Sequence, residues 1–472
     1  MSVSSVSNRV TLPSLDEGRS IVFDPDRLTF ARVDAGLADR ADRYARLGHG
    51  ELALTEEDHA VWAKVEQALQ ACAPLVPPEF GGTSITKLIV GNTYHCNMGC
   101  TYCYNELDLK DRKGSEVPAG MSWETAKASI DALLAQAEAP ALQLLFVGGE
   151  PLLEKQILRQ SVAYAQERTK HTGQKVSFAV YTNGTLMNPE TIAWAGDNDV
   201  SLVVSLDGPA DLNTHRIYLS GRPTTKPVLR NIKRLVESGT QHILRVRAVS
   251  NPGTPLVALH RYLYDLGFNE IHVQPMYDES GIAAAEEQEL VKLLEWYRER
   301  LLEGTALGVM PFEGFIGKLV LRGKGTGSWY PCSAGRNALA VGPTGTLYPC
   351  HHFLEEGSFE MGDVRRGLPI VEVRQPFFQR VDEREPCNSC WAKHACGGEC
   401  YHRAHAAGAG YTGTLPATCR HRKSLIGLTL DVLADVAARR PDALKAVVTQ
   451  RYSRVEPFAP AYEYTDLSPY AE

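Results

Sequence analysis

The stretch Tyr94–Glu106, YHCNMGCTYCYNE, contains Cys96, Cys100 and Cys103. A structural zinc ion or a closed four-iron cluster takes four protein ligands, so three thiolates around a four-iron cluster leave one iron open to a small molecule. The alternative is a zinc site that borrows His95, which is a poor ligand because it adjoins Cys96 in the chain. The stretch therefore predicts a three-cysteine cluster with one open coordination position.

From Ser84 onward, short apolar runs alternate with amphipathic segments of helix length. This alternation predicts an α/β fold with a parallel sheet, open or barrel-like, that is closed by crossover helices. Polar turns follow the carboxyl ends of the strands, which is where β/α folds place active sites. The six expected strands are 85–91, 141–150, 175–184, 200–208, 243–250 and 270–277.

The composition of the 472 residues, 44% of them hydrophobic, allows a sizeable core. The net charge of −7 and the lack of a basic run argue against nucleic acid or an anionic membrane as partner. We find no apolar run long enough for a membrane span and no apolar signal core at the N-terminus. We therefore expect a cytoplasmic protein, in which cysteines bind metal more often than they form disulfides.

The chain divides into four predicted segments. Residues 1–84 form a small α+β segment, either a peptide-recognition element or a cap on the following domain. Residues 85–320 form the β/α domain. Residues 321–425 are rich in Gly, Pro and Cys and need metal staples, because they cannot bury much core. Residues 426–472 form a C-terminal helix and tail.

Seven further cysteines crowd the third segment, and only Cys72 lies outside both groups. We expect Cys72 to be a buried, inert thiol in a helix. The seven are Cys332, Cys350, Cys387, Cys390, Cys396, Cys400 and Cys419.

The C-x3-C-x2-C pattern, with Tyr102 before its last cysteine, resembles the signature of the radical S-adenosylmethionine (SAM) enzymes. The resemblance implies a partial (β/α)6 TIM-like barrel and a catalytic 4Fe–4S cluster on Cys96, Cys100 and Cys103. In that family the open iron chelates the cofactor's amine and carboxylate. One electron from the cluster then produces a 5′-deoxyadenosyl radical, which abstracts hydrogen from the substrate.

Other strings resemble the cofactor contacts of that family. In the GGEP string, Gly148 and Gly149 let the backbone approach closely, and Glu150 offers an acceptor to the cofactor's ammonium group. Arg216 is the candidate partner of the cofactor's carboxylate, although the family's usual spacing is not kept. The remaining predicted cofactor contacts are Tyr102, Thr182, Asn183, Ser205, Asp207 and Gln274.

The late cysteines resemble the SPASM extension of peptide-modifying radical SAM enzymes, which carries two auxiliary clusters. The resemblance assigns Cys387, Cys390, Cys396 and Cys419 to a distal cluster, and Cys332, Cys350 and Cys400 to a proximal one. The total is three 4Fe–4S clusters. Two alternatives stay open for the fourth proximal ligand. The first is a noncysteine ligand, namely an Asp, a His such as His351, or water. The second is a substrate thiolate, which iron binds well.

The segment 347–364, LYPCHHFLEEGSFEMGDV, resembles thioether-forming peptide maturases, and more narrowly the maturation proteins of quinohemoprotein amine dehydrogenase. Sulfatase maturases typically have Asp where this chain has His351. We therefore expect crosslinks from Cys sulfur to a carbon of an acceptor such as Asp or Glu in a ribosomally made polypeptide, with flavodoxin or ferredoxin as electron donor. The alternatives are formylglycine formation, a carbon–carbon crosslink, or a zinc-stapled binding protein. Glu399 and Asp363 are candidate bases, each expected more often to be a surface acid.

Overall fold

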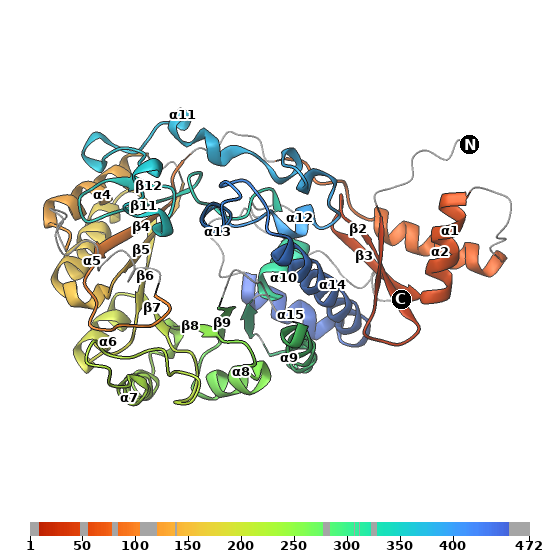
Figure 1. Ribbon diagram of the computed structural model, residues 1–472, viewed down its shortest axis with the longest axis horizontal. Helices are drawn as coiled ribbons and strands as arrows, with labels where there is room; N and C mark the ends of the chain where they lie inside the picture. The colour runs from red at the N-terminus through yellow and green to blue at the C-terminus, as the bar shows by residue number, and fades with distance from the viewer. Residues whose placement is uncertain are drawn as a thin grey trace. The chain divides into compact units, whose positions relative to one another are not determined.

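The computed structural model forms two compact units (Figure 1). The sheet unit comprises Phe80–Met276 and Ser333–Gln379, and the terminal unit comprises Met1–Glu79, Tyr277–Cys332 and Arg380–Glu472. Each unit combines stretches that are separate in the sequence and contact one another in space. The units therefore do not test the four predicted segment boundaries, which stay predictions. The structure describes residues 9–47, 55–77, 84–103, 120–136, 139–276, 284–305, 307–310, 312–321 and 328–452.

The sheet unit confirms the predicted α/β fold. Its strands lie in the order β9-β8-β7-β6-β5-β4-β11-β12, and β4 to β9 are the six predicted strands, paired in parallel. The strands are β4 (Lys87–Thr93), β5 (Ala141–Gly148), β6 (Lys175–Thr182), β7 (Val200–Ser205), β8 (Leu244–Ser250), β9 (Glu270–Pro275), β11 (Ala338–Val341) and β12 (Leu347–Tyr348).

Helices cover one face of this sheet, which we call the outer face (Figure 1). In β8, Leu244, Val246 and Ala248 are buried, as expected beneath helices. Arg245 and Arg247 alternate with them, are half-buried, and therefore lie on the opposite, inner face. The helices of the unit are α4 (Trp123–Gln136), η2 (Pro151–Glu154), α5 (Lys155–Thr169), α6 (Pro189–Asp197), α7 (Thr225–Glu237), η3 (Gln241–Ile243), α8 (Leu256–Asp265), η5 (His351–Phe353), η6 (Gly357–Phe359), η7 (Val364–Arg366), α11 (Val371–Arg374) and η8 (Gln375–Phe378).

Strands β11 and β12 were not predicted. β11 pairs in parallel with β4, and β12 pairs antiparallel with β11, so the segment after Cys332 extends the sheet beyond its first predicted strand. Both strands are fully buried. The cysteine-rich segment therefore does bury apolar core, through a short hairpin.

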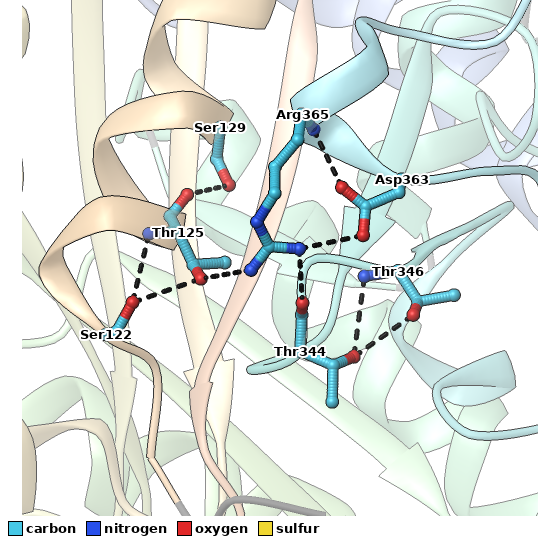
Figure 2. Close-up of polar contacts among 7 residues, drawn as sticks. All are labelled: Ser122, Thr125, Ser129, Thr344, Thr346, Asp363 and Arg365. Carbon is cyan, nitrogen blue, oxygen red and sulfur yellow. Dashed lines mark hydrogen bonds and ion pairs between the residues drawn. The ribbon is translucent and has the colours of Figure 1, made fainter.

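Arg365 fastens this added segment to helix α4, as Figure 2 shows. Its guanidinium donates to the Thr125 hydroxyl at 2.9 Å, to the Thr344 carbonyl at 2.9 Å and to the Asp363 carboxylate at 2.8 Å. The Asp363 carboxylate also accepts the backbone N–H of Arg365 at 2.8 Å. The segment 344–365 is thus tied to the outer side of the sheet unit by one exposed arginine.

The terminal unit begins with an antiparallel sheet in the order β1-β2-β3, as the sequence predicts for residues 1–84. Helix α2 starts with a capping box, in which the Thr55 hydroxyl accepts the N–H of Asp58. Cys72 lies just after the end of α2 and is half-buried, so the prediction of a buried helical thiol was wrong. The elements are β1 (Val10–Pro13), β2 (Arg19–Asp24), β3 (Thr29–Asp34), α1 (Ala35–Leu47), α2 (Glu56–Gln70), α9 (Ala284–Leu302), β10 (Gly308–Met310), α10 (Phe312–Leu321), η9 (Val381–Glu383), η10 (Cys387–Ser389), α12 (Lys393–Cys396), α13 (Tyr401–Ala406), α14 (Pro416–Arg439) and α15 (Pro441–Tyr452).

Helix α14 begins at Pro416, before the predicted C-terminal segment 426–472, because proline suits the first helical position. Cys419 consequently lies in its first turn. Across the residues that the structure describes, none of the helices has the length and hydropathy needed to cross a membrane.

Buried His260 in α8 makes stability depend on pH. Its ring Nδ1–H donates to the Leu256 carbonyl at 2.8 Å, and burial lowers its pKa to about 4. The unfolded chain takes up this proton near pH 6.5, before the folded chain does, so stability falls from pH 6.5 to about 4. We expect His260 to account for a loss of about 3 kcal/mol across this window.

Denaturant unfolding at several pH values measures this loss. The variant His260→Leu removes the titrating group, so the slope of stability against pH should become shallower. An unchanged slope between pH 6.5 and 4 would show that His260 is not the group responsible.

Candidate active site and auxiliary metal site

The three-cysteine loop leaves the carboxyl end of β4. Cys96, Cys100 and Cys103 are half-buried, and the N–H of Cys103 donates to the Cys100 carbonyl at 3.1 Å. Burial, together with the neighbouring Glu150, Cys100 and Cys103, raises the pKa of Cys96 to about 12. A thiol with this pKa becomes a thiolate at neutral pH only beside a cation, so these sulfurs suit a bound iron cluster.

The two glycines of the GGEP string let two stretches of backbone pack closely, and their predicted contact with the cofactor stays a prediction. A Cβ atom on Gly149 would lie 2.1 Å from the His95 carbonyl oxygen, and one on Gly148 would lie 2.1 Å from the Thr93 carbonyl oxygen. The N–H groups of Gly149 and Glu150 donate to these same two carbonyls at 2.8 and 2.7 Å. The glycines therefore let the end of β5 pack directly against the backbone of the cysteine loop.

Glu150 joins the ends of β5 and β6 from a fully buried position. Its carboxylate accepts from the N–H of Leu152 at 3.0 Å, the hydroxyl of Thr182 at 2.8 Å and the N–H of Asn183 at 2.7 Å. Burial nevertheless raises its pKa to about 7, against these three hydrogen bonds. A nearby cation would stabilise the charged form, so the predicted contact with the cofactor's ammonium group is chemically reasonable and stays a prediction.

Asn183 links this junction to the cysteine loop. Its amide nitrogen donates to the Asn97 side-chain oxygen at 2.8 Å and lies 3.8 Å from the Cys96 sulfur. The structure thus brings Glu150, Thr182 and Asn183 together beside Cys96.

A second group, Tyr102, Asp207 and Arg216, holds the other end of the loop. The Tyr102 hydroxyl donates to the Asp207 carboxylate, and the Arg216 guanidinium forms an ion pair with Asp207 at 3.0 Å. The guanidinium also lies 5.4 Å from the centre of the Tyr102 ring. The backbone N–H of Val249 donates to Asp207 at 2.9 Å.

Asp207 is only 2% exposed and Arg216 only 9% exposed, so this ion pair is buried. Sequence reasoning treated Asp207 and Arg216 as separate cofactor contacts. The geometry makes Asp207 the residue that positions Arg216 and Tyr102, because its oxygens accept from all three neighbours.

The last two predicted cofactor contacts lie on strands. Ser205 is the final residue of β7 and is half-buried, whereas Gln274 of β9 is exposed. Among the described residues, neither side chain has a polar contact that would define its role, and both assignments stay predictions.

The terminal unit contains a cavity lined by all four predicted distal ligands, Cys387, Cys390, Cys396 and Cys419. Within the described residues, no group of three or more His, Cys, Asp or Glu side chains is placed to hold a single metal ion. A 4Fe–4S cluster makes a different demand, because each cysteine bonds a separate iron. Four sulfurs spread around a cavity meet that demand.

Two cations support Cys396. A guanidinium nitrogen of Arg422 lies 3.4 Å from its sulfur, and Lys318 donates to its carbonyl at 2.6 Å. Burial raises the pKa of Cys396, but Arg422 and Lys318 outweigh it and leave that pKa below its usual value. Burial also lowers the pKa of Lys318 to about 8. This environment stabilises a thiolate, the form that binds iron.

The two candidate bases both form ion pairs with arginines. Glu399 is 3% exposed, so the expectation of a surface acid was wrong, and it lies 3.6 Å from Arg403 and from Arg422. Asp363 is paired with Arg365.

The predicted proximal ligands are divided between the units: Cys350 belongs to the sheet unit, and Cys332 and Cys400 belong to the terminal unit. Cys332 is exposed, and the other two are half-buried. That they share one cluster stays a prediction.

Sequence reasoning missed one contact near the cysteine loop. The Tyr94 hydroxyl, two residues before Cys96, donates to the Glu355 carboxylate, five residues after Cys350. Glu355 has a left-handed φ of 66°, which is uncommon for a residue with a side chain. No motif marks this pair, because it depends on the unpredicted pairing of β11 with β4.

Residues 93–251 match the model of the Radical SAM superfamily, and residues 332–391 match that of SPASM, an iron–sulfur cluster-binding domain. The chain contains a Radical SAM domain and a SPASM domain. Its cofactors are therefore 4Fe–4S clusters and S-adenosylmethionine. The radical SAM match covers the cysteine loop, the GGEP string and the Asp207–Arg216 pair.

Three known proteins are similar to this chain. The serine-type anaerobic sulfatase-maturating enzyme of Klebsiella aerogenes is 28% identical over 329 residues, covering 66% of this chain and 78% of the relative. The PqqA peptide cyclase of Rhodopseudomonas palustris is 23% identical over 340 residues, covering 69% and 84%. The solved structure of native anSMEcpe with bound AdoMet and Cp18Cys peptide has a TM-score of 0.61 at 18% identity, covering 77% and 99%, and shares the fold.

Proposed function

We propose that this enzyme is a peptide maturase that forms thioether crosslinks in a ribosomally made polypeptide. The bond joins a cysteine sulfur to a carbon of an acidic acceptor residue. The observation that carries the proposal is that the sequence offers only three cysteines, Cys332, Cys350 and Cys400, for the predicted proximal cluster, which would leave a position for a substrate thiolate. Relatives named as a sulfatase-maturating enzyme and a peptide cyclase support a peptide substrate.

The residues around the cysteine loop prepare the radical step. When bound, the first cluster and S-adenosylmethionine supply a reducing electron and the radical that abstracts hydrogen. Cys96, Cys100 and Cys103 would hold the cluster, and the buried Asp207–Arg216 pair holds Tyr102 in the same loop. Arg216 would attract the cofactor's carboxylate, and Glu150 its ammonium group.

The substrate reaction removes a hydrogen atom from carbon, which the 5′-deoxyadenosyl radical takes, and a proton from sulfur as the new bond forms. One electron is left over, and the auxiliary clusters would accept it. The thiol proton needs an acceptor. The described acids Asp363 and Glu399 are each held by arginine, whereas coordination to iron would itself favour the thiolate. This difference supports deprotonation on the auxiliary cluster rather than by a dedicated carboxylate.

Two auxiliary clusters would complete the enzyme, one on the four cysteines around the cavity and one on the proximal set. With the first cluster they would bring the iron content to about twelve per chain. A flavodoxin or ferredoxin would supply the electrons.

The second candidate function is formylglycine formation, favoured by the sulfatase-maturating relative. Such enzymes resemble this chain around Cys350, but His351 follows it here instead of Asp. His351 is half-buried, and its ring centre lies 4.2 Å from that of His352. A histidine pair in place of the carboxylate supports the thioether reaction over this alternative.

Product mass separates the candidates. Holoenzyme, reductant and S-adenosylmethionine are incubated with a cysteine-containing peptide from a neighbouring reading frame. We expect a loss of two hydrogens per crosslink together with loss of one free thiol. A product that retains every thiol would instead be a carbon–carbon crosslink, and conversion of cysteine to an aldehyde would establish formylglycine formation.

A further inference from the structure

Arg247 is a cation on the inner face of the sheet with no acid to balance it. It lies in the middle of β8 and is half-buried. Among the residues that the structure describes, no carboxylate forms an ion pair with it. Removing a guanidinium from water is costly unless an anion or several acceptors compensate, so such an arginine is suited to a ligand.

A neighbouring arginine shows the contrast. Arg245 lies two residues earlier on β8, on the same face, and its guanidinium is 2.8 Å from the Glu270 carboxylate. The two side chains thus share strand, face and chemistry, but within the described part of the chain only Arg245 has an acid partner.

The Arg247 guanidinium is held in place by an aromatic ring. Its central carbon lies 5.1 Å from the centre of the Tyr181 ring, which comes from β6. A guanidinium over a ring keeps its N–H edge available, and this fork matches both oxygens of a carboxylate. Tyr181 therefore orients the group without using its donors.

The cross-strand neighbours of Arg247 add no charge. Ser205 of β7 and His272 of β9 are its register partners on either side. Burial, together with the charge of Arg247, lowers the pKa of His272 to about 3, so His272 is neutral at physiological pH. The row presents a single positive charge flanked by a hydroxyl and a neutral ring.

This row lies close to the residues that hold the cysteine loop. Val249, two residues after Arg247, donates its N–H to Asp207, which in turn binds Arg216 and Tyr102. Two residues along a strand span about 7 Å. Arg247 is therefore within a side chain's length of the loop where the radical chemistry is proposed to occur.

We propose that Arg247 binds the carboxylate of the acidic acceptor residue in the substrate peptide. This inference rests on the proposed function and names the residue that selects the acceptor. Two carboxylates could reach the region, that of the substrate and that of the cofactor. Arg216 is already the predicted partner of the cofactor's carboxylate, which leaves Arg247 for the substrate.

Chemical labelling tests the site without turnover. Phenylglyoxal is added to the holoenzyme with S-adenosylmethionine and no reductant, and the labelling of Arg247 and Arg245 is followed by mass spectrometry. Arg247 should react about three times faster than Arg245, because an exposed or half-exposed ion pair protects only weakly. If Arg247 were labelled more slowly than Arg245, its guanidinium would already be occupied by another group, and the inference would be wrong.

Two synthetic peptides then identify the ligand. Acetyl-Gly-Gly-Cys-Gly-Gly-Asp-Gly-Gly-amide at ten times its Kd should slow the labelling of Arg247 about tenfold. The counterpart with Asn in place of Asp should not protect. Equal protection by both peptides, protection by neither, or protection by S-adenosylmethionine alone would overturn the inference.

Substitutions supply a second measurement. Arg247→Gln should raise KM for the Asp peptide roughly 10- to 100-fold, as expected for losing a charge-assisted hydrogen bond, and should have no such effect with the Asn peptide. The matched control Arg245→Gln should leave KM within about threefold. The labelling result does not depend on which bond the enzyme forms in the peptide. If the Asp peptide protects Arg247 but no thioether product forms, the proposed thioether reaction is wrong and the carboxylate site at Arg247 still stands.

Discussion

Replacing Gly149 with alanine is expected to abolish cofactor cleavage. The added methyl group would lie 2.1 Å from the His95 carbonyl oxygen, and that oxygen belongs to backbone that cannot move without shifting Cys96. Displacements of about 1 Å at a catalytic centre can cost a factor of about 100. We therefore expect the yield of 5′-deoxyadenosine to fall by at least about 100-fold, with loss of iron from the first cluster.

Gly357→Ala is the matched control. Gly357 has open space at its Cβ position and lies in the same unit. The Gly357→Ala variant should bind iron and cleave the cofactor as the parent enzyme does. Gly149→Ala with parental iron content and activity would show that close packing of β5 on the cysteine loop is not needed.

Replacing Asp207 with asparagine is expected to destabilise the fold and impair cofactor binding together. The substitution leaves the buried Arg216 guanidinium without its anion and weakens the acceptor for Tyr102. Breaking a buried ion pair in this way typically costs about 3–5 kcal/mol. The free energy of unfolding of the apoprotein and the Kd for S-adenosylmethionine in the holoenzyme measure the two effects.

The exposed pair of Arg159 and Glu190, 2.7 Å apart, provides the comparison. Glu190→Gln should change stability by less than about 1 kcal/mol, because exposed ion pairs contribute little. If Asp207→Asn were as mild as this control, the pair would not be what holds the loop.

The fold was largely predictable because each strand of the parallel sheet carries its own apolar run. Strand β8, predicted at 243–250, is Leu244–Ser250. Strand β11, Ala338–Val341, was missed because four residues between cysteines give no periodic signal. Its pairing with β4 depends on a contact between segments about 250 residues apart, which local pattern does not encode.

The candidate site was predictable only as far as motifs mark it. The cysteines, Glu150 and Asn183 stand in strings with fixed spacing, whereas Arg247 stands in a strand with none. It stands out only in the structure, where Tyr181 and His272 lie beside it and where, among the described residues, Arg245 but not Arg247 has an acid partner. The close approach that the glycines permit was predicted, but their packing against the backbone of the cysteine loop was not, because the sequence does not say which backbone comes close.

The most direct measurement is the release of 5′-deoxyadenosine by the anaerobically reconstituted enzyme in the presence of dithionite and S-adenosylmethionine. A cluster held by Cys96, Cys100 and Cys103 predicts iron- and sulfide-dependent release, which disappears when the three cysteines are replaced by alanine. A fully reconstituted parent enzyme that releases none, or the same release from the triple variant, would contradict the account.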